Sequence, residues 1–327
     1  MFKSYLMNRS QCVKVNGHKS EYMNIYTGVP QGSILGPILF ILFINDFPLI
    51  SDQSKMFLYA DDTTICLSDS NYDSLVGKVN AELVKVGDWI ADNKLSMNIG
   101  KSCWMLVTTK TIRQNIEQDV SFNNVPLKLC EQAKSLGVIF DNNLSFKPHI
   151  NYIVGKISKI VGIFYKLKPI VPKEILINLY YSLVYPHLTY CILIWGGTYR
   201  THLSDIELLQ KKLVRLITNS EYLAHSKPLF YQTGILNIFE LYEYHLGIFA
   251  FKNKSKFHHA THNYSTRNAE LFVPCFSRLS ISQRTIWYAA PNFFNSLPTE
   301  LKECRSLGIF KKKCKTYLLN RYRPEST

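Results

Sequence analysis

Two adjacent carboxylates, Asp61 and Asp62, stand in the stretch FLYADDTTI at residues 57–65. An apolar run of strand character leads into them, and a second β-prone run, TTICL, follows at once. Like charges at a tight turn repel each other, and each carboxylate needs water or a cation. Carboxylate oxygens suit Mg²⁺, whose charge removes this repulsion. The pair is therefore a candidate metal site, although such a pair can also serve only to accept hydrogen bonds from turn amides.

The elements around this pair are predicted from turn residues and periodicity. Residues 56–67 are predicted as a hairpin, and Asn16-Gly17 predicts the turn of another hairpin between 12–15 and 21–26. The apolar run at 34–44 is expected to be a buried helix, because a bilayer span needs about 20 residues. Apolar residues recur at intervals of three and four between 70 and 90, which predicts an amphipathic helix.

Strands are expected within 95–108 and at 134–140, and helices from about residue 150. This order predicts an α+β fold, in which helices cover one face of an antiparallel sheet and a mainly helical region follows. The helical segments are expected at 153–164, 173–185, 203–218 and 238–252, with a last unit near 265–327. Lys156, Lys159 and Lys166 fall roughly opposite the apolar face of the first of these helices.

Composition favours a globular protein with a polyanionic partner. Hydrophobic residues make up 46% of the 327 residues, and the formal net charge is +14. The charge is uneven: residues 1–100 carry 8 Lys and Arg against 10 Asp and Glu, and residues 101–327 carry 30 against 14. Basic side chains gain affinity for nucleic acid by releasing phosphate counterions, although many basic proteins bind no polyanion. The basic run KKKCK at 311–315 most simply fits a charged helix end.

Cysteine spacing and apolar runs point to an intracellular protein, in the cytoplasm, the nucleus or both. The eight cysteines form no CxxC pair, which favours reduced thiols over a zinc or disulfide framework. No segment resembles a signal peptide or a membrane span, so no membrane partner is expected. The histidines of HHATH at 258–262 have the spacing of metal ligands but no accompanying carboxylate, which favours a solvated loop.

Four ordered motifs carry a family resemblance. GVPQGSILGPILFILFINDFP at 28–48, FLYADDTTI, LSMNIGKS at 95–102 and SLGVIFD at 135–141 resemble the polymerase core of non-LTR, LINE- and jockey-like reverse transcriptases. The region from SRLSISQ to KTYL, residues 277–318, resembles the tail that follows the polymerase in such elements. The implied domains are a partial palm at 1–148, a helical thumb at 149–220 and a basic helical region at 221–327.

The resemblance implies a role for each motif. Asp61, and less directly Asp62, would hold two Mg²⁺ ions, and Lys101 would neutralise or protonate pyrophosphate. Other motif residues would contact the template and incoming nucleotide, lie near the primer end, or form the strand that grips the primer. These are Gln31, Gly32 and Ser33; Tyr59 and Ala60; and Leu136, Gly137 and Val138. Lys156, Lys159 and Lys166 would follow the nucleic-acid backbone. The implied partners are an RNA template, a DNA primer and dNTPs.

Each role has a simpler structural alternative. Gly32 and Gln31 could only form a turn, and Lys101 and the three helix lysines could only be solvated. The sequence also departs from the family. The third metal aspartate, expected upstream in a pattern like F-D-x-x-x-A-F-D, is not found, because Asp46 is the first aspartate of the chain.

The chain is therefore expected to be a carboxyl-terminal piece of such an enzyme, without the fingers and the preceding endonuclease. Losing one metal ligand costs several kcal/mol of transition-state stabilisation, so this polypeptide alone is expected to be inactive or nearly so. Two other functions stay open: a nucleic-acid-binding remnant without catalysis, and a host protein that reuses the fold for protein contacts.

Overall fold

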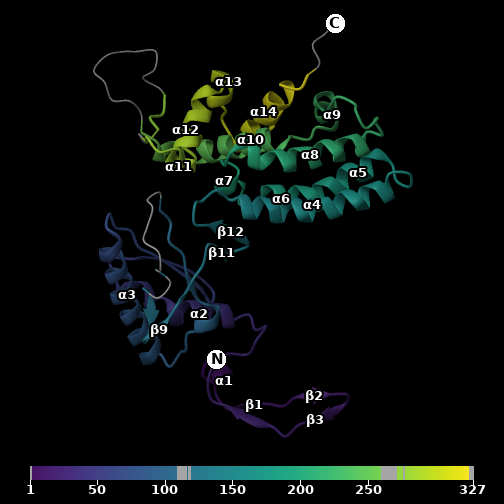
Figure 1. The fold of residues 1–327 in the computed structure, drawn as a ribbon. Coiled ribbons are helices and arrows are strands. Elements are labelled where there is room, and N and C mark those ends of the chain that lie inside the picture. Colours follow the sequence, from purple (N-terminus) through teal and green to yellow (C-terminus); the bar gives the residue numbers. More distant parts are fainter. Residues whose placement is uncertain (1, 109–115, 117–118, 259–270, 275–276, 324–327) are drawn as a thin grey trace. The chain divides into compact units, whose positions relative to one another are not determined.

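The computed structural model describes residues 2–108, 116, 119–258, 271–274 and 277–323. The chain forms two compact units, one of Met1–Trp104 with Arg113–Leu129 and one of Met105–Ile112 with Cys130–Thr327. The first unit mixes helices with short strands, and the second is mainly helical (Figure 1). The fold is thus α+β, as the sequence predicts. None of the described helices has the length and apolar character needed to span a membrane.

The first unit begins with short antiparallel ladders. Helix α1 (Phe2–Leu6) precedes β1 (Arg9–Gln11), which pairs with β4 (Met23–Ile25). Between them, β2 (Lys14–Val15) pairs with β3 (His18–Lys19) around a turn at Asn16-Gly17. Both turn residues have positive φ, 49° and 88°, which is the geometry that an Asn-Gly pair accepts most easily. The predicted turn is confirmed, and the strands that it joins are shorter than expected.

The apolar run at 34–44 forms a helix, α2 (Gly36–Ile44), but the expectation that it is buried is wrong. Gly36 is its only buried residue, and Ile38 and Leu42 are 53% and 68% exposed. The helix is apolar on every side, so the one side that packs on the small core of this unit leaves the others uncovered.

The middle of the first unit is a hairpin packed on a long helix. Strands β5 (Lys55–Tyr59) and β6 (Asp62–Cys66) pair antiparallel, and α3 (Tyr72–Asp92) follows, so both predicted elements are confirmed. The Asn71 side chain caps α3 by accepting a hydrogen bond from the Ser74 amide, which explains where the helix begins. Phe47, Val86, Trp89 and Phe122 belong to the core of this unit, and half-buried Met56, Leu58 and Ile65 of the hairpin pack against it.

The remaining elements of the first unit are short. They are η1 (Phe47–Ile50), η2 (Ile99–Lys101), β7 (Cys103–Trp104), β8 (Ser121–Phe122), β9 (Val125–Pro126) and β10 (Lys128–Leu129). β8 pairs with β9 antiparallel, whereas β7 pairs with β10 in parallel. All the ladders of the described residues are two-stranded, so the expected single antiparallel sheet is not seen there.

The second unit opens with a hairpin where a single strand was expected at 134–140. β11 (Gln132–Ser135) pairs antiparallel with β12 (Val138–Asp141). The chain reverses at Leu136 and Gly137, whose φ values are 45° and 84°. Two consecutive positive φ values define a tight hairpin turn, and the apolar character of the surrounding residues concealed it from the sequence analysis.

Helices make up the rest of the second unit. They are α4 (Lys147–Leu167), α5 (Lys173–Leu179), the π-helical η3 (Tyr180–Val184), α6 (Tyr185–Thr189), α7 (Ile192–Trp195), α8 (Arg200–Ile217), α9 (Ser226–Thr233), α10 (Ile238–Lys252), η4 (Lys254–Lys256), α11 (Ser280–Gln283), α12 (Ile286–Ser296), α13 (Thr299–Lys302) and α14 (Leu307–Asn320). The helices predicted at 203–218 and 238–252 are confirmed within three residues at each end. The expected helix at 173–185 is present as α5 and η3.

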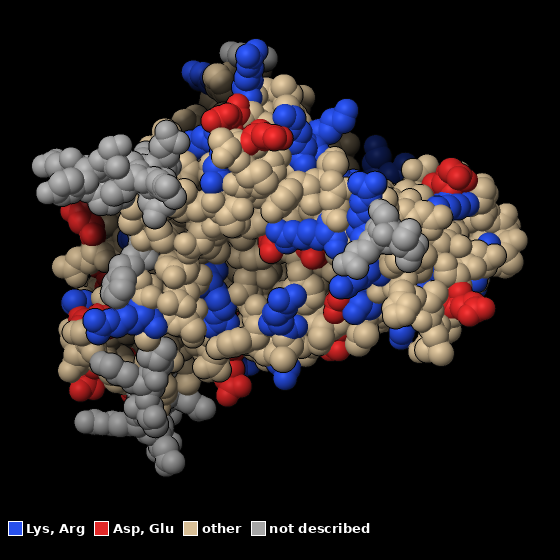
Figure 2. Space-filling view, turned by 90° about the horizontal axis from the view of Figure 1, so that it is seen from above, with Lys and Arg blue, Asp and Glu red and all other residues tan. Residues whose placement is uncertain are grey.

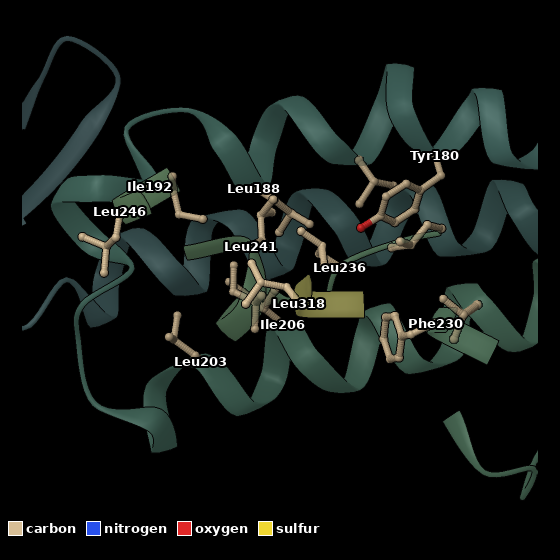
Figure 3. Packing of buried hydrophobic residues seen from close by; sticks show 14 of the residues in the cluster. Tyr180, Leu188, Ile192, Leu203, Ile206, Phe230, Leu236, Leu241, Leu246 and Leu318 are labelled. Atoms are coloured by element: carbon tan, nitrogen blue, oxygen red, sulfur yellow. The ribbon is translucent and has the colours of Figure 1, made fainter. Parts of the chain in front are cut away.

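One apolar core joins these helices (Figure 3). Its buried residues run from Ile150 in α4 to Tyr322 beyond α14. Gln210 is fully buried inside it, donates to the Tyr180 hydroxyl at 2.9 Å and accepts from the Ile238 amide at 2.7 Å. These bonds compensate for burying the polar amide. The regions predicted as 149–220 and 221–327 therefore share one core.

Candidate functional site

The aspartate pair lies at the tip of the β5–β6 hairpin. The register places Tyr59 opposite Asp62, so these two side chains share one face of the ladder. Alternation along β5 directs Met56 and Leu58 to the core and leaves Phe57 and Tyr59 exposed. Asp61 stands in the turn itself, and both carboxylate residues are exposed. The core-facing residues therefore hold the hairpin while its tip and outer face remain open to a ligand.

The turn between the strands is strained at Ala60. Its φ is 51°, although it has a Cβ, and Asp61 does not share this positive φ. A positive φ at the first central residue alone is typical of a type II′ turn, where glycine is the favoured residue. Residues in such conformations persist only where the surrounding structure enforces them, and they are frequent at functional sites. The strain fixes where the two carboxylates emerge.

A buried carboxylate on α3 tethers the start of the hairpin. Glu82 accepts a hydrogen bond from the Ser54 hydroxyl at 2.9 Å, directly before β5, and an ion-pair contact from Lys85 at 2.8 Å. Burial raises the pKa of the Glu82 carboxyl, but hydrogen bonds from Lys85, Ser51 and Ser54 outweigh it, and the net pKa is lowered. Glu82 is thus a charged anchor that fixes the hairpin on α3.

The donor set at the tip suits a hard cation but is small. Within the part of the chain that the structure describes, neither Asp61 nor Asp62 takes part in an ion pair, so their oxygens are available to a ligand. The described residues contain no group of three or more His, Cys, Asp or Glu side chains arranged to hold a metal. Mg²⁺ is often held by one or two carboxylates together with substrate phosphates, so the two residues fit part of such a site.

The QGS loop precedes α2. Gln31 and Gly32 form an exposed turn in which Gly32 has a φ of 76°, and a Cβ built on Gly32 would meet no heavy atom within 4 Å. The glycine is therefore needed for its backbone conformation, and the space beside it is open. The Ser33 hydroxyl accepts a hydrogen bond from the amide of Gly36, the first residue of α2, at 3.0 Å, although the N-cap position itself is Leu35 and has no side-chain cap.

Lys101 ends η2 and is exposed. Its backbone amide bonds to Asn98, which caps this short helix. In the described residues no ion pair joins Lys101 to Asp61 or Asp62. The structure thus places Asp61, Asp62, Tyr59 and Ala60 on one hairpin, whereas Lys101 lies on a separate element, η2.

The other predicted site residues lie in the second unit. Leu136 and Gly137 form the exposed β11–β12 turn, whereas Val138 is 2% exposed and belongs to the interior. The Tyr190 hydroxyl donates to the Leu136 carbonyl at 2.5 Å, and a Cβ on Gly137 would lie 3.3 Å from the Tyr190 ring. The Trp195 indole in turn donates to the Tyr190 carbonyl at 2.9 Å. The helical core thus fixes the turn.

Three predicted lysines form a row on α4. We call Lys156, Lys159 and Lys166 the α4 lysine stripe; all three are exposed. The opposite side of α4 is buried, as predicted from the apolar periodicity, and includes Ile153, Ile157 and Phe164. Basic side chains are also spread over the face seen in Figure 2, where acidic ones are fewer. His258 is described, but the rest of the HHATH segment lies outside the described residues.

Sequence reasoning missed residues that support these sites. Tyr190 holds the Leu136 turn across 54 residues of sequence, and no local pattern indicates this pairing. Lys134 and Lys156 both approach the ring of Tyr152, at 5.8 and 5.4 Å. Tyr152 could have been noticed, because it lies one helical turn before Lys156, but nothing in the sequence links Lys134 to either residue.

Comparison with known proteins shows which proteins this chain is similar to. Residues 1–140 match the family described as reverse transcriptase (RNA-dependent DNA polymerase). The chain is 28% identical over 251 residues to the probable RNA-directed DNA polymerase from transposon X-element of Drosophila melanogaster, covering 73% of this chain and 27% of the relative. It is 28% identical over 243 residues to the RNA-directed DNA polymerase from mobile element jockey of Drosophila funebris, covering 70% and 26%.

A third relative, the probable RNA-directed DNA polymerase from transposon BS of Drosophila melanogaster, is 28% identical over 68% of this chain and 26% of its own length. The chain therefore spans about a quarter of the length of these curated relatives. No solved structure matches it. The aspartate hairpin and the QGS loop both lie inside the matched residues 1–140, so the part of the chain that is similar to reverse transcriptases includes both motifs.

Proposed function

We propose that this chain carries part of the active site of an RNA-directed DNA polymerase. The reaction joins the 3′-oxygen of a DNA primer to the α-phosphorus of a dNTP and releases pyrophosphate, with RNA as template. The observation that supports it most is the exposed pair Asp61 and Asp62 at the tip of a hairpin anchored on α3, inside the region that matches the family. Both aspartates are proposed as metal ligands.

The aspartate hairpin and the QGS loop are proposed to have different roles in the reaction. Asp61 and Asp62 supply oxygen ligands at the tip, and the strained Ala60 turn fixes their direction. When bound, two Mg²⁺ ions would neutralise phosphate charge and favour the ionised 3′-hydroxyl. The open turn of Gln31 and Gly32, with Ser33 behind it, is proposed to lie against the template and the incoming nucleotide.

Further residues are proposed to contact the primer, the pyrophosphate and the nucleic-acid backbone. The exposed Tyr59 shares a face with Asp62 and is proposed to meet the primer end. Lys101 is proposed to balance the charge of pyrophosphate. In the primer grip, the exposed Leu136 and Gly137 would meet the backbone, and the buried Val138 would hold them in place. The α4 lysine stripe is proposed to bind phosphates further along the duplex.

Asp61 and Asp62 are the two carboxylates proposed as metal ligands, and the complete reaction is proposed to need a third carboxylate. Removing one group that stabilises transition-state charge typically costs about 10²–10³ in rate. Primer extension by this polypeptide alone should therefore be slow, and a third carboxylate would come from another part of the enzyme. We accordingly propose a palm-like role for residues 1–148 and thumb and tail roles for 149–220 and 221–327.

The proposal is tested by measuring dNTP binding in the presence of Mn²⁺, a substitute for Mg²⁺ that spectroscopy can detect. Asp61→Asn should abolish the metal-dependent part of dNTP binding. Asp52→Asn, which makes the same change at another exposed aspartate of the first unit, should leave it intact. Equal behaviour of the two variants would contradict the proposal.

A second candidate function is nucleic-acid binding without catalysis. It is favoured by the α4 lysine stripe, since α4 contains no acidic residue at all. Under this alternative, the Asp61→Asn variant would still bind an RNA–DNA hybrid. Neither the variant nor the unaltered chain would extend a primer.

A further inference from the structure

The guanidinium of Arg9 joins three points of the backbone in the first unit. Its Nε donates to the carbonyl of Leu6, the last residue of α1, at 3.0 Å. Its Nη2 donates to the Gly28 carbonyl at 2.7 Å and to the Thr27 carbonyl at 3.4 Å. We call these three hydrogen bonds the Arg9 clamp. No ion pair of the described residues includes Arg9, so the clamp is made with backbone carbonyls.

The β1–β4 ladder brings Arg9 to this place. Arg9 is the first residue of β1 and lies opposite Ile25, the last residue of β4. Thr27 and Gly28 follow Ile25 by two and three residues, so the chain leaves the ladder beside the Arg9 side chain. A cap of α1 needs only the bond to Leu6, but the clamp also reaches 18 and 19 residues along the chain. The clamp therefore connects α1 with the segment that leads into the QGS loop.

The segment around the QGS loop has little packing of its own. Gly28 and Gly32 have φ values of 73° and 76°, and a Cβ built on either would meet no heavy atom within 4 Å. Glycine adopts such values without steric cost, but it also adopts many others, so the two glycines permit this shape and do not enforce it. A long backbone hydrogen bond crosses the turn, from the Ser33 amide to the Pro30 carbonyl at 3.4 Å. The order of the segment must therefore come from its two ends.

The carboxyl end of the segment is fixed on α2. The Ser33 hydroxyl accepts from the amide of the buried Gly36 at 3.0 Å. A Cβ on Gly36 would lie 2.9 Å from the Ser33 hydroxyl oxygen and 3.4 Å from a methyl carbon of Val29, so the segment lies directly on the first residue of α2. The Arg9 clamp holds the amino end at Thr27 and Gly28. Residues 29–33 thus span between two attachments.

We propose that Arg9 is a positioning residue of the nucleotide site. By fixing the Thr27 and Gly28 carbonyls, the Arg9 clamp sets the direction in which Gln31 and Gly32 face the incoming nucleotide. Arginine suits this role, because its planar fork holds carbonyls of separate segments at once, whereas a lysine ammonium is a single point of charge. That the loop meets a nucleotide rests on the proposed function. The clamp and its effect on the order of the loop rest on the hydrogen bonds.

The test measures the order of the loop and the affinity for dNTP in the full chain. Loop order is given by the heteronuclear NOE of the Gly28, Gln31 and Gly32 amides. The affinity for dNTP is measured in the presence of Mn²⁺, and the affinity for Mn²⁺ is measured separately without dNTP. Arg9→Gln should lower the NOE of all three amides and weaken dNTP binding about tenfold, because it removes charge-assisted hydrogen bonds. The affinity for Mn²⁺ alone should stay unchanged, because the proposed metal ligands lie on the separate aspartate hairpin.

Two further variants separate positioning from folding. Lys14→Gln removes one charge from β2 and should change neither the NOE values nor the affinity for dNTP. Arg9→Lys keeps the charge but not the fork, so its affinity for dNTP should lie between those of Arg9→Gln and the unaltered chain. The cross-strand NOE between Gln11 and Met23, which are paired in the ladder, should persist in every variant. An equal loss of dNTP affinity in Lys14→Gln, or a loss that accompanies unpairing of β1 and β4, would overturn the proposal.

The outcomes distinguish this inference from the polymerase function. If Arg9→Gln leaves the loop ordered, or loosens it without changing the affinity for dNTP, the inference is overturned even where Asp61→Asn abolishes metal-dependent dNTP binding. If Arg9→Gln weakens dNTP binding and Asp61→Asn does not, the loop is a nucleotide site held by Arg9, and the proposed metal ligands are wrong. An unaltered chain without affinity for dNTP would overturn the inference whatever the order of its loop.

Discussion

Ala60 shows how one residue constrains the candidate metal site. An L-residue with a Cβ pays about 1–2 kcal/mol for left-handed backbone, and this cost persists only where neighbours enforce it. The neighbours here are the paired Tyr59 and Asp62 on either side of the turn and the core contacts of Met56 and Leu58. The strain is thus local and measurable, and it is coupled to the direction of the two carboxylates.

Ala60→Gly should stabilise the first unit by up to about 1 kcal/mol, because relief of the strain exceeds the extra backbone entropy of glycine in the unfolded chain. Denaturant unfolding followed by tryptophan fluorescence measures the change. Ala81→Gly in the middle of α3 is the matched control and should destabilise by about 1 kcal/mol. The same sign for both substitutions would show that Ala60 is not strained.

At the scale of elements, the hairpins are held from outside. Glu82 of α3 anchors β5–β6 through Ser54, and Tyr190 anchors β11–β12 through the Leu136 carbonyl. An isolated two-stranded hairpin is marginally stable in water, so these tethers account for much of the order of both turns. Each hairpin is therefore a pair of short strands that is positioned by contacts within its own unit.

Tyr190→Phe should cost about 1 kcal/mol, because it removes one hydrogen bond and keeps the ring that packs on Gly137. Amide exchange at the β11–β12 turn should accelerate in this variant. Tyr165→Phe, at an exposed position of α4, is the control and should change neither quantity. If amide exchange at the turn is unchanged in Tyr190→Phe, the hydrogen bond from Tyr190 to the Leu136 carbonyl does not stabilise the turn.

Gln210→Leu should destabilise the second unit by about 2–4 kcal/mol. The substitution leaves the Tyr180 hydroxyl and the Ile238 amide buried without their partner, and each unsatisfied group costs about 1–3 kcal/mol. Gln132→Leu, at an exposed position of β11, should change stability by less than about 0.5 kcal/mol. Thermal unfolding of the two variants provides the comparison.

Elements with strong local signals could be predicted from the sequence. The Asn16-Gly17 turn, the aspartate hairpin, α3 and α10 follow from turn residues and from apolar periodicity over many residues. The burial of α2 was mispredicted, because a helix that is apolar on all sides does not reveal how much surface its neighbours cover. The contact of Lys134 with the Tyr152 ring and the hydrogen bond from Tyr190 to Leu136 join residues far apart in sequence, and local sequence patterns hold no information about such contacts.

At the scale of the whole molecule, the two units have different titrating groups in their cores. The second unit buries His149 and half-buries His245, and burial lowers the pKa of each below the ordinary value of 6.5, with Lys311 adding to the effect at His245. Residues 1–104 and 113–129 contain a single histidine, His18, which is exposed. A mildly acidic pH should therefore affect the units unequally.

The sign follows from proton binding. A histidine with a lowered folded pKa binds more protons in the unfolded chain, so the stability of the second unit is fully present above pH 6.5 and declines as the pH falls through the folded pKa values. The pKa of Glu82 in the folded first unit is below the ordinary value of 4.5, so the unfolded chain binds the proton first, and the contribution of Glu82 to stability is present above pH 4.5 and is lost as the pH falls through the lowered pKa. Hydrogen exchange of the two units at pH 7, 6 and 5 measures this difference. Equal loss in both units over this range would contradict it.

The central claim is that the aspartate hairpin binds the catalytic metal. The most direct measurement is paramagnetic broadening of backbone amide resonances by substoichiometric Mn²⁺ in the presence of a dNTP. The broadening should be centred on Tyr59 to Thr63, disappear in Asp61→Asn/Asp62→Asn and persist in Asp52→Asn. Broadening centred elsewhere, or left unchanged by loss of both aspartates, would contradict the claim.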